Sequence, residues 1–444
     1  MRIDAATGPT TRQAWWITGV LGMASYLDAA AIAGTGTALV LYQKSLGLSG
    51  GDIGALSALL TFSIAIGALV GGRLGDRFGR RRIFAVTMIM FAVGAGLLTA
   101  APGVGFLYAG LVILGLSSGA DLPVSLSMIG EAAPAGKRGQ MVGSTNFLWV
   151  LGIVGVILIG IFFGALGATG ARIIYGHLFV ISILVLICRS GIPESAKWRQ
   201  AADTRTASVA INGAASDIGA LRQLAHSRFL LPVIALGLFF GIANISANTN
   251  GQFQTYVYVN VAGLDVPTAS LFGLIGIGIG LASTLLFVRL VDGVGARRWM
   301  LRVAAVLAIC AFVLPAAVGV TPATIITSTI LFSIGGGIMG EPMYKVWSQE
   351  IIPVLFRSSV QGITIAFTRL LAAAIALVTP AIIATGATNL YWFLTGTTVI
   401  AVTIGLFWLP RFQRADDEAG ISADGAVPIG GVDDGVAVKH GTAQ

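Results

Sequence analysis

Twelve long apolar runs, separated by short polar segments, dominate this chain of 444 residues. They lie at about 15–42, 53–74, 83–101, 104–130, 140–165, 170–189, 229–259, 267–290, 299–318, 322–349, 358–385 and 389–409. About 20 apolar residues suffice for one helical crossing of a bilayer, whereas a membrane β-barrel shows short alternating segments. With 56% hydrophobic and only 10% charged residues, the chain cannot be a water-soluble globule. We predict an all-α membrane protein with twelve transmembrane helices.

The basic residues predict how these helices are oriented. Of the 27 Lys and Arg residues, 23 lie in segments on the same side as the N-terminus. Lys44 and Arg172 lie on the other side, and Lys345 and Arg369 lie within apolar runs. Because basic residues accumulate on the cytoplasmic side, both termini are predicted to be cytoplasmic. The net charge of +8 is spread over short clusters, which argues against a nucleic-acid-binding patch.

A single long polar segment divides the chain into halves with six apolar runs each. We predict a cytoplasmic N-terminus (1–14), a first six-helix bundle (15–189), a cytoplasmic linker (190–228), a second six-helix bundle (229–410) and a disordered tail (411–444).

Two charged patterns recur between the halves. The pattern E-x-x-P-x-x-x-R occurs at 131–138 and 350–357, and D-x-x-G-x-R-R occurs at 76–82 and 292–298. Both patterns return at nearly the same offset along the chain, so the halves are two copies of one unit. An even number of helices in each copy keeps both in the same orientation, which predicts two pseudo-symmetric six-helix bundles. Parallel repeats of this kind enclose a solute site near the bilayer midplane and expose it alternately to each side.

The segment between the second and third runs reads Gly72-Arg-Leu-Gly-Asp76-Arg77-Phe-Gly79-Arg80-Arg-Arg82. Its glycines permit a tight turn, and its charges can form ion pairs across the cytoplasmic ends of the helices. We therefore predict a latch that holds only while the cytoplasmic side is closed.

These residues resemble the G-x-L-x-D-R-x-G-R-R signature of the major facilitator superfamily, over residues 72–81. Pro193-Glu-Ser195 and the two E-x-x-P-x-x-x-R loops resemble its sugar porter branch and the organic-solute symporters related to that branch. The resemblance implies a twelve-helix carrier with an inner gate network. The implied gate residues are Gly72, Asp76, Arg77, Gly79, Arg80, Arg81, Glu131 and Arg138 in the first half, and Asp292, Arg297, Arg298, Glu350 and Arg357 in the second.

Two acidic residues lie deep within the first bundle. Asp28 is about twelve residues into the first helix, and Asp121 is ten residues before Glu131 in the fourth. A charge near the bilayer centre costs about 2.5–3.5 kcal/mol, and burial favours the protonated carboxyl. We predict that both residues exchange protons during transport, although either could be a permanently neutral structural group. Proton-coupled sugar porters carry an Arg on the fourth helix, and residues 108–116 contain none.

Three further ionisable residues lie in the second half. Glu341 and Lys345 are four residues apart, and Arg369 lies at a depth comparable with Glu341. One interpretation is a mutually neutralising cluster of all three. The other is that Arg369 holds a carboxylate solute, because guanidinium matches that geometry.

The seventh helix is rich in neutral hydrogen-bonding groups, which suit a hydroxyl-rich solute, although some of them must link helices instead. The candidate solute-binding residues there are Asn244, Asn248, Asn250, Gln252, Gln254 and Tyr256. Further candidates on other helices are Asn146, Trp149, Glu341, Tyr344, Trp347 and Arg369.

The sequence thus predicts a proton-coupled importer of a small polar metabolite, a sugar or polyol in the first place. A carrier of a small organic acid, an efflux carrier and a non-transporting sensor are the alternatives. No phosphate-binding loop, metal-ligand cluster or nucleophile triad is present, so we expect no cofactor and no enzyme activity. The expected partners are solute, protons and the lipid of a bacterial inner membrane, and we expect a monomer.

Overall fold

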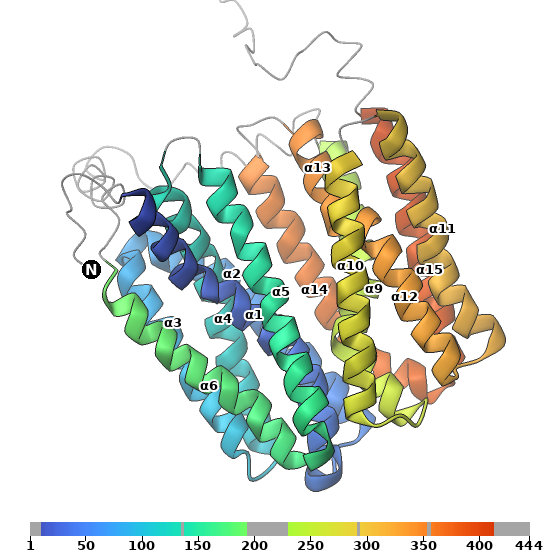
Figure 1. Cartoon of the computed structure of the whole chain (residues 1–444), viewed down its shortest axis with the longest axis horizontal. Helices are drawn as coiled ribbons and strands as arrows, with labels where there is room; N and C mark the ends of the chain where they lie inside the picture. The colour runs from blue at the N-terminus through green and yellow to red at the C-terminus, as the bar shows by residue number, and fades with distance from the viewer. Residues whose placement is uncertain (1–9, 135–136, 193–229, 291–293, 353–356, 413–444) are drawn as a thin grey trace, which may run out of the picture.

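The computed structural model describes residues 10–134, 137–192, 230–290, 294–352 and 357–412 (Figure 1). The N-terminal half contains α1 (Thr11–Leu46), α2 (Gly50–Phe78), α3 (Arg80–Ala100), α4 (Val104–Ala132), α5 (Arg138–Phe163) and α6 (Ala168–Ser190). The C-terminal half contains α9 (Leu230–Asn260), α10 (Val266–Leu290), α11 (Val294–Val318), α12 (Pro322–Met339), α13 (Glu341–Ile351), α14 (Arg357–Ala384) and α15 (Ala387–Thr403). Twelve helical stretches of the described residues are long and apolar enough to cross a bilayer, which confirms the predicted number. Most of the expected linker (190–228) and all but the first two residues of the expected tail (411–444) lie outside the described residues.

The predicted helix 322–349 is interrupted, which the apolar run did not indicate. Gly340 has a ψ of −127°, far from the helical value, and it separates α12 from α13. Pro342 then lies in the first turn of α13, where its missing N–H group leaves no hydrogen bond unmade. Glu341 consequently begins a new helix instead of continuing the old one.

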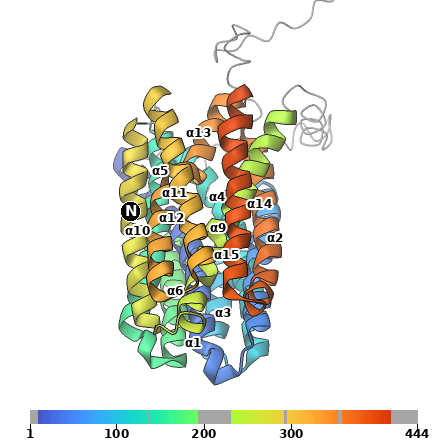
Figure 2. The ribbon, with the colours of Figure 1, turned by 90° about the vertical axis from the view of Figure 1, so that its right-hand side faces the viewer.

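The helices form two bundles, and every helix runs roughly along one common direction (Figure 2). Helices α1 to α6 pack together, as do α9 to α15. In the first bundle Tyr42 stacks on Tyr175 with ring centroids 6.5 Å apart. Tyr258 and Tyr391 occupy the equivalent positions of the second half, and both are buried in the second bundle. The repeat seen in the loops therefore also places buried tyrosines at matching positions of the two halves.

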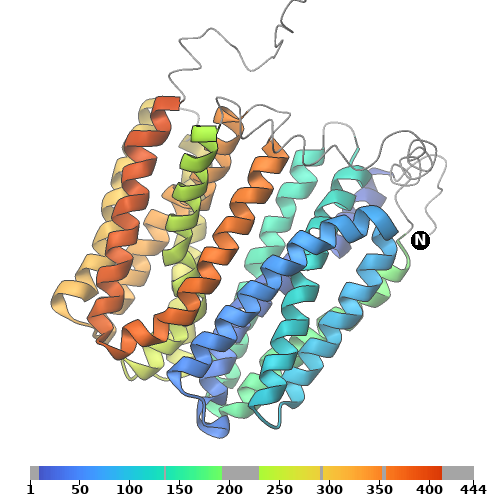
Figure 3. The ribbon, with the colours of Figure 1, turned by 180° about the vertical axis from the view of Figure 1, so that it is seen from behind.

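We call the end at which α1 begins and α15 ends the inner end, and the opposite end the outer end. The bundles meet through α1 with α9, α2 with α14 and α5 with α10. Helices α2 (blue) and α14 (orange) converge toward the outer end, as Figure 3 shows. The resulting outer seam consists of Gly36, Thr37, Gly54 and Thr61 in the first bundle and Gln252, Thr255, Ala376 and Pro380 in the second.

Close packing and hydrogen bonds hold the outer seam together. A Cβ atom on Gly36 would lie only 2.3 Å from the backbone oxygen of Gln252, so a glycine is needed there. The Gln252 side chain donates a hydrogen bond of 2.7 Å to Thr61 across the seam. Small residues of this kind let membrane helices approach closely. The bundles are therefore closed against each other in the outer half of the molecule.

Candidate functional site

The centre of the interface holds an ion pair between the two bundles. Asp28 of α1 is buried, with 1% of its side chain exposed, and its Oδ1 accepts a hydrogen bond of 2.9 Å from Ser118 of α4. Its Oδ2 lies 3.8 Å from Nη2 of Arg369 on α14, in the opposite bundle. No hydrogen-bond donor reaches Oδ2 among the described residues. Oδ1 of Asp28 is thus hydrogen-bonded within the first bundle, whereas Oδ2 faces the guanidinium of Arg369 in the second bundle.

This pairing corrects the predicted cluster of Glu341, Lys345 and Arg369. Glu341 and Lys345 form an ion pair of 2.8 Å on one face of α13, with about half of each side chain exposed. Arg369 lies beside Asp28 instead, and 24% of its side chain is exposed. The prediction is wrong about the partner of Arg369, because an arginine can pair with a carboxylate on a helix that is distant in the sequence, here Asp28 on α1.

Asp121 lies in a separate ion pair inside the first bundle. Its Oδ1 is 2.6 Å from Nη1 of Arg189 on α6 and accepts a hydrogen bond of 3.0 Å from Thr87 on α3. Arg189 also donates to the backbone oxygen of Leu21 on α1. Both charged side chains are almost fully buried, at 1% and 3% exposure. The Asp121–Arg189 pair therefore joins four helices of one bundle, whereas Asp28 faces the opposite bundle. The coupling role of Asp121 stays a prediction.

Sequence analysis missed Arg189 and the hydroxyl residues Ser118 and Thr87 of these clusters. The basic-residue count places Arg189 with the inner segments because it is the last residue of an apolar run. A signal was available, since a carboxylate as deep as Asp121 needs a partner and α6 continues to Ser190. No comparable signal singles out Ser118 among the many hydroxyl groups of the chain.

The amides of α9 divide between two faces of that helix. Asn244, Asn248 and Gln252 are spaced four residues apart and so lie on one face. Gln252 reaches Thr61 across the outer seam, which means that this face looks toward the first bundle. Asn248 donates to the side-chain oxygen of Asn244, so the two amides form a polar stripe on the inner side of the seam.

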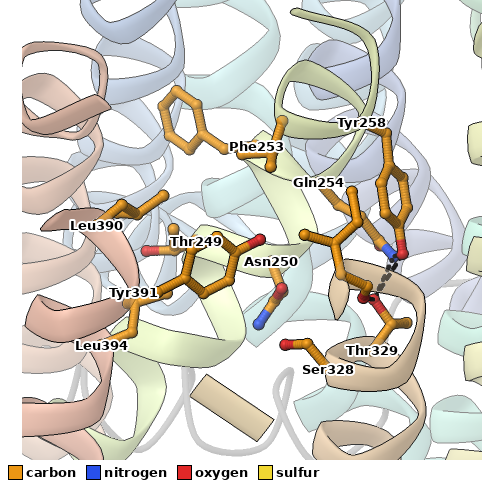
Figure 4. Close-up of a pocket in the computed structure, with 12 residues that line it drawn as sticks. Thr249, Asn250, Phe253, Gln254, Tyr258, Ser328, Thr329, Leu390, Tyr391 and Leu394 are labelled. Atoms are coloured by element: carbon orange, nitrogen blue, oxygen red, sulfur yellow. Dashed lines mark hydrogen bonds between the residues drawn. The ribbon is translucent and has the colours of Figure 1, made fainter. Parts of the chain in front are cut away.

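The other amides of α9 face into the second bundle. Asn250 and Gln254 line a cavity of about 20 Å³ between α9, α12 and α15 (Figure 4). Tyr258 and Thr329 share a hydrogen bond of 2.6 Å at its edge, and Gln254 donates to Tyr258 at 3.4 Å. This volume holds about one water molecule. Gln254 donates to Thr329 and so links α9 to α12, whereas Asn250 donates to the backbone oxygen of Ser246 on its own helix. Both side chains face the cavity inside the second bundle, and their assignment as solute ligands stays a prediction.

The predicted aromatic ligands Tyr344 and Trp347 are core residues. Tyr344 is stacked on Phe240 at 4.0 Å between ring centroids, and Trp347 packs edge-on against Phe239 at 5.0 Å. Both are buried in the second bundle, where they pack against other aromatic side chains, and their assignment as solute ligands stays a prediction.

The remaining candidates lie on exposed or partly buried faces. Asn146 is exposed and Trp149 is half-buried on α5. Tyr256 lies at the outer end of the seam, with its hydroxyl oxygen 2.8 Å from where a Cβ on Gly50 would be.

Equivalent ion pairs join the inner ends of helices in both bundles. Arg80 pairs with Glu131, which joins α3 to α4, and Arg297 pairs with Glu350 at 2.6 Å, which joins α11 to α13. Arg81 donates to the backbone oxygen of Ser190 at 3.0 Å. Gly79 has a φ of 95°, which lets α2 end and α3 begin at one residue. Arg298 is exposed.

For several predicted gate residues no contact can be described. Asp292 and the side chains of Asp76, Arg77, Arg138 and Arg357 lie outside what the structure describes, and Gly72 is part of α2.

Arg80→Ala is expected to slow turnover by roughly tenfold, because a partly buried charged hydrogen bond contributes about 1.5–3 kcal/mol. The relative affinities of competing solutes should not change, since Arg80 lies at the inner ends of α3 and α4. Initial rates and competition constants measure the two effects. Arg302→Gln, at an exposed site on α11, is the control, and altered competition in Arg80→Ala would contradict a gate role.

Gly36→Val is expected to prevent closure of the outer seam and to lower transport about tenfold or more, because overpacking costs about 1–3 kcal/mol. A cysteine at Thr37, in a background with Cys188 and Cys310 replaced by Ser, should then react faster with a membrane-impermeant thiol reagent from the outer side. Gly19→Val is the matched control, because nothing lies within 4 Å of that site on the same helix. Unchanged labelling in Gly36→Val would contradict the assignment of the seam.

Two helical bundles that meet at a seam, with a buried ion pair bridging them midway along α1, define a membrane transporter of the two-bundle class. Residues 18–377 match the family model of the Major Facilitator Superfamily, and the chain belongs to this family. The resemblance seen at residues 72–81 is confirmed, and so is the prediction that the protein is a transporter and not an enzyme.

The relatives lie in the sugar porter branch. The minor myo-inositol transporter of Bacillus subtilis (strain 168) is 30% identical over 399 residues, which cover 88% of this chain and 89% of the relative. A glucose transporter of Staphylococcus epidermidis (strain ATCC 12228 / FDA PCI 1200) is 26% identical, with 79% and 82% of the two chains covered. Among solved structures, a D-xylose–proton symporter shares the fold, with a TM-score of 0.71, 20% identity, and 91% and 99% of the two chains covered.

Proposed function

We propose that this protein imports a small neutral polyol, in the first place a cyclic polyol such as myo-inositol, together with protons and by alternating access. The observation that carries the proposal is the stripe of neutral amides on the interface face of α9, formed by Asn244, Asn248 and Gln252. Amides both donate and accept, as hydroxyl groups do, so they can replace the water around a polyol. The similarity to a myo-inositol transporter over most of both chains supports the same solute class.

Proton coupling is supported by Asp28. A carboxyl group that is buried at the bundle interface, with one oxygen that no hydrogen-bond donor reaches in the described part of the chain, can take up and release a proton as its surroundings change. The distribution of basic residues supports a cytoplasmic location for the inner end, in the plasma membrane of a bacterium.

The test is uptake of labelled myo-inositol by proteoliposomes with an imposed inward proton gradient. We expect accumulation that a protonophore abolishes and that excess unlabelled polyol competes away. Asn248→Ala should raise the KM about tenfold, because one hydrogen bond contributes roughly 1–1.5 kcal/mol. Asn250→Ala, whose side chain lines the cavity within the second bundle, is the matched control. The proposal would be refuted if the protein transported neither polyols nor sugars and neither class competed for uptake.

A small organic acid is the second candidate, and Arg369 is the observation that favours it. Its guanidinium is partly exposed beside the interface and suits a carboxylate. A niacin transporter of Acinetobacter baylyi (strain ATCC 33305 / BD413 / ADP1) is 31% identical over 180 residues, 40% of each chain. Competition by excess niacin, with no competition by polyols, would select this solute class.

A further inference from the structure

Asp28 and Arg369 are the one ion pair that joins the two bundles among the described residues. The other described ion pairs each lie within a single bundle. At 3.8 Å between Oδ2 and Nη2, the pair is at the outer limit for a direct contact, so a small separation of α1 and α14 breaks it. Ser118 holds only the other oxygen, Oδ1. The distance from Oδ2 to its positive partner therefore depends on the position of the second bundle relative to the first.

The other ionisable groups near Asp28 are engaged elsewhere in the described part of the chain. His177 of α6 is 2.9 Å from the hydroxyl oxygen of Tyr26 and contacts the backbone oxygen of Ile174. The Asp121 and Arg189 charges neutralise each other. Helix α4 contributes the neutral Ser118, and no described side chain of α5 or α9 forms an ion pair with Asp28. The charge that Asp28 faces is thus the charge of Arg369.

The helices that carry this pair also carry the outer seam. Gly36 follows Asp28 by eight residues on α1, and Ala376 follows Arg369 by seven residues on α14. At 1.5 Å per residue, the seam begins roughly 10–12 Å outward from the pair. Opening the seam requires α1 and α14 to move apart, because they belong to different bundles. The same movement separates Arg369 from Asp28.

We propose that Arg369 is the positioning residue that ties protonation of Asp28 to the position of the bundles. With the outer seam closed, the guanidinium favours the charged carboxylate, so the O–H bond of Asp28 breaks and the proton passes to water on the inner side. With the outer seam open, the buried carboxylate has lost its counter-charge, so it accepts a proton from water on the outer side. This inference rests on the proton coupling proposed above and identifies the group that controls it.

The test needs no solute, so its outcome is independent of the solute class. Spin labels at Gln140 on α5 and Ala296 on α11, both exposed at the inner end, report the separation of the bundles when Cys188 and Cys310 are replaced by Ser. In the otherwise unchanged protein, acidification should shorten the mean distance between labels, because protonated Asp28 no longer attracts Arg369. Arg369→Gln and Asp28→Asn should each abolish the dependence of this distance on pH.

Three further variants separate a charge effect from damage to the fold. Arg369→Lys keeps the positive charge and should keep the pH-dependent change in distance, and Arg302→Gln removes an unrelated arginine and should keep it too. The exchange Asp28→Arg with Arg369→Asp should restore the pH dependence that either neutral variant lacks. A pH response that survives in Arg369→Gln, or none in the parent protein, would overturn the proposal. Failure of polyol uptake with these distances as expected would instead refute only the solute assignment.

Discussion

Asp28→Asn is expected to abolish accumulation of the solute against its gradient, while exchange of internal for external solute continues at close to the normal rate. Asparagine has nearly the same shape and still accepts the hydrogen bond from Ser118, but it cannot carry a proton or pair with Arg369. Proteoliposomes measure both activities in one preparation. The proton gradient should raise uptake in the parent protein and leave uptake unchanged in the variant.

Asp52→Asn is the matched control for this prediction. Asp52 also lies in the first bundle, but it is exposed in the capping box of α2, where its carboxylate accepts from Ser49 at 2.7 Å. The Asp52→Asn variant should accumulate solute normally, since asparagine is also favourable at the N-terminus of a helix. Normal gradient-driven accumulation in Asp28→Asn would remove Asp28 from the coupling mechanism.

Asp121→Asn or Arg189→Gln is expected to lower the free energy of unfolding by about 3 kcal/mol or more, because removal of one partner leaves a buried charge without compensation. The contacts of this pair reach α1, α3, α4 and α6, so the whole first bundle should loosen. Thermal unfolding in detergent measures the loss as a lower midpoint. A midpoint within error of the parent would show that the pair does not stabilise the bundle.

The double variant Asp121→Leu with Arg189→Met tests whether charge itself is needed. Apolar side chains of similar size often replace a buried ion pair without loss of stability. We expect the double variant to recover most of the midpoint lost in either single variant and to keep proton-driven uptake. Loss of coupling in a stable double variant would place Asp121 in the coupling mechanism.

The sequence is most informative about features that depend on a single segment. The twelve helices follow from the length and apolarity of each run, because every crossing must satisfy its own backbone hydrogen bonds within the bilayer. Asp28 is identifiable as a functional candidate for a similar reason, since its depth follows from its position along one helix. The repeat of the charged patterns between the two halves likewise needs only the order of residues along the chain.

The partners of the charged residues could not be obtained in this way. Arg369 pairs with Asp28, which lies in the opposite half of the chain. Arg189 pairs with Asp121, which lies two helices earlier in the same half. The regular spacing of Glu341 and Lys345 suggested a cluster that includes Arg369, but only the rotation of α14 about its axis determines which neighbour its arginine meets. The same holds for α9, whose amides look alike in the sequence and divide between an interface and an internal cavity.

The sequence by itself therefore determined the number of helices, the two-fold repeat, the family and one buried carboxyl group at the right depth. Only the tertiary structure decided that Arg369 is the partner of Asp28, that Asp121 is held by Arg189, and that the bundles are closed along the outer seam. The physical reason is that hydropathy acts along a single segment, whereas ion pairs and close glycine contacts depend on how helices distant in the chain are rotated and placed against one another.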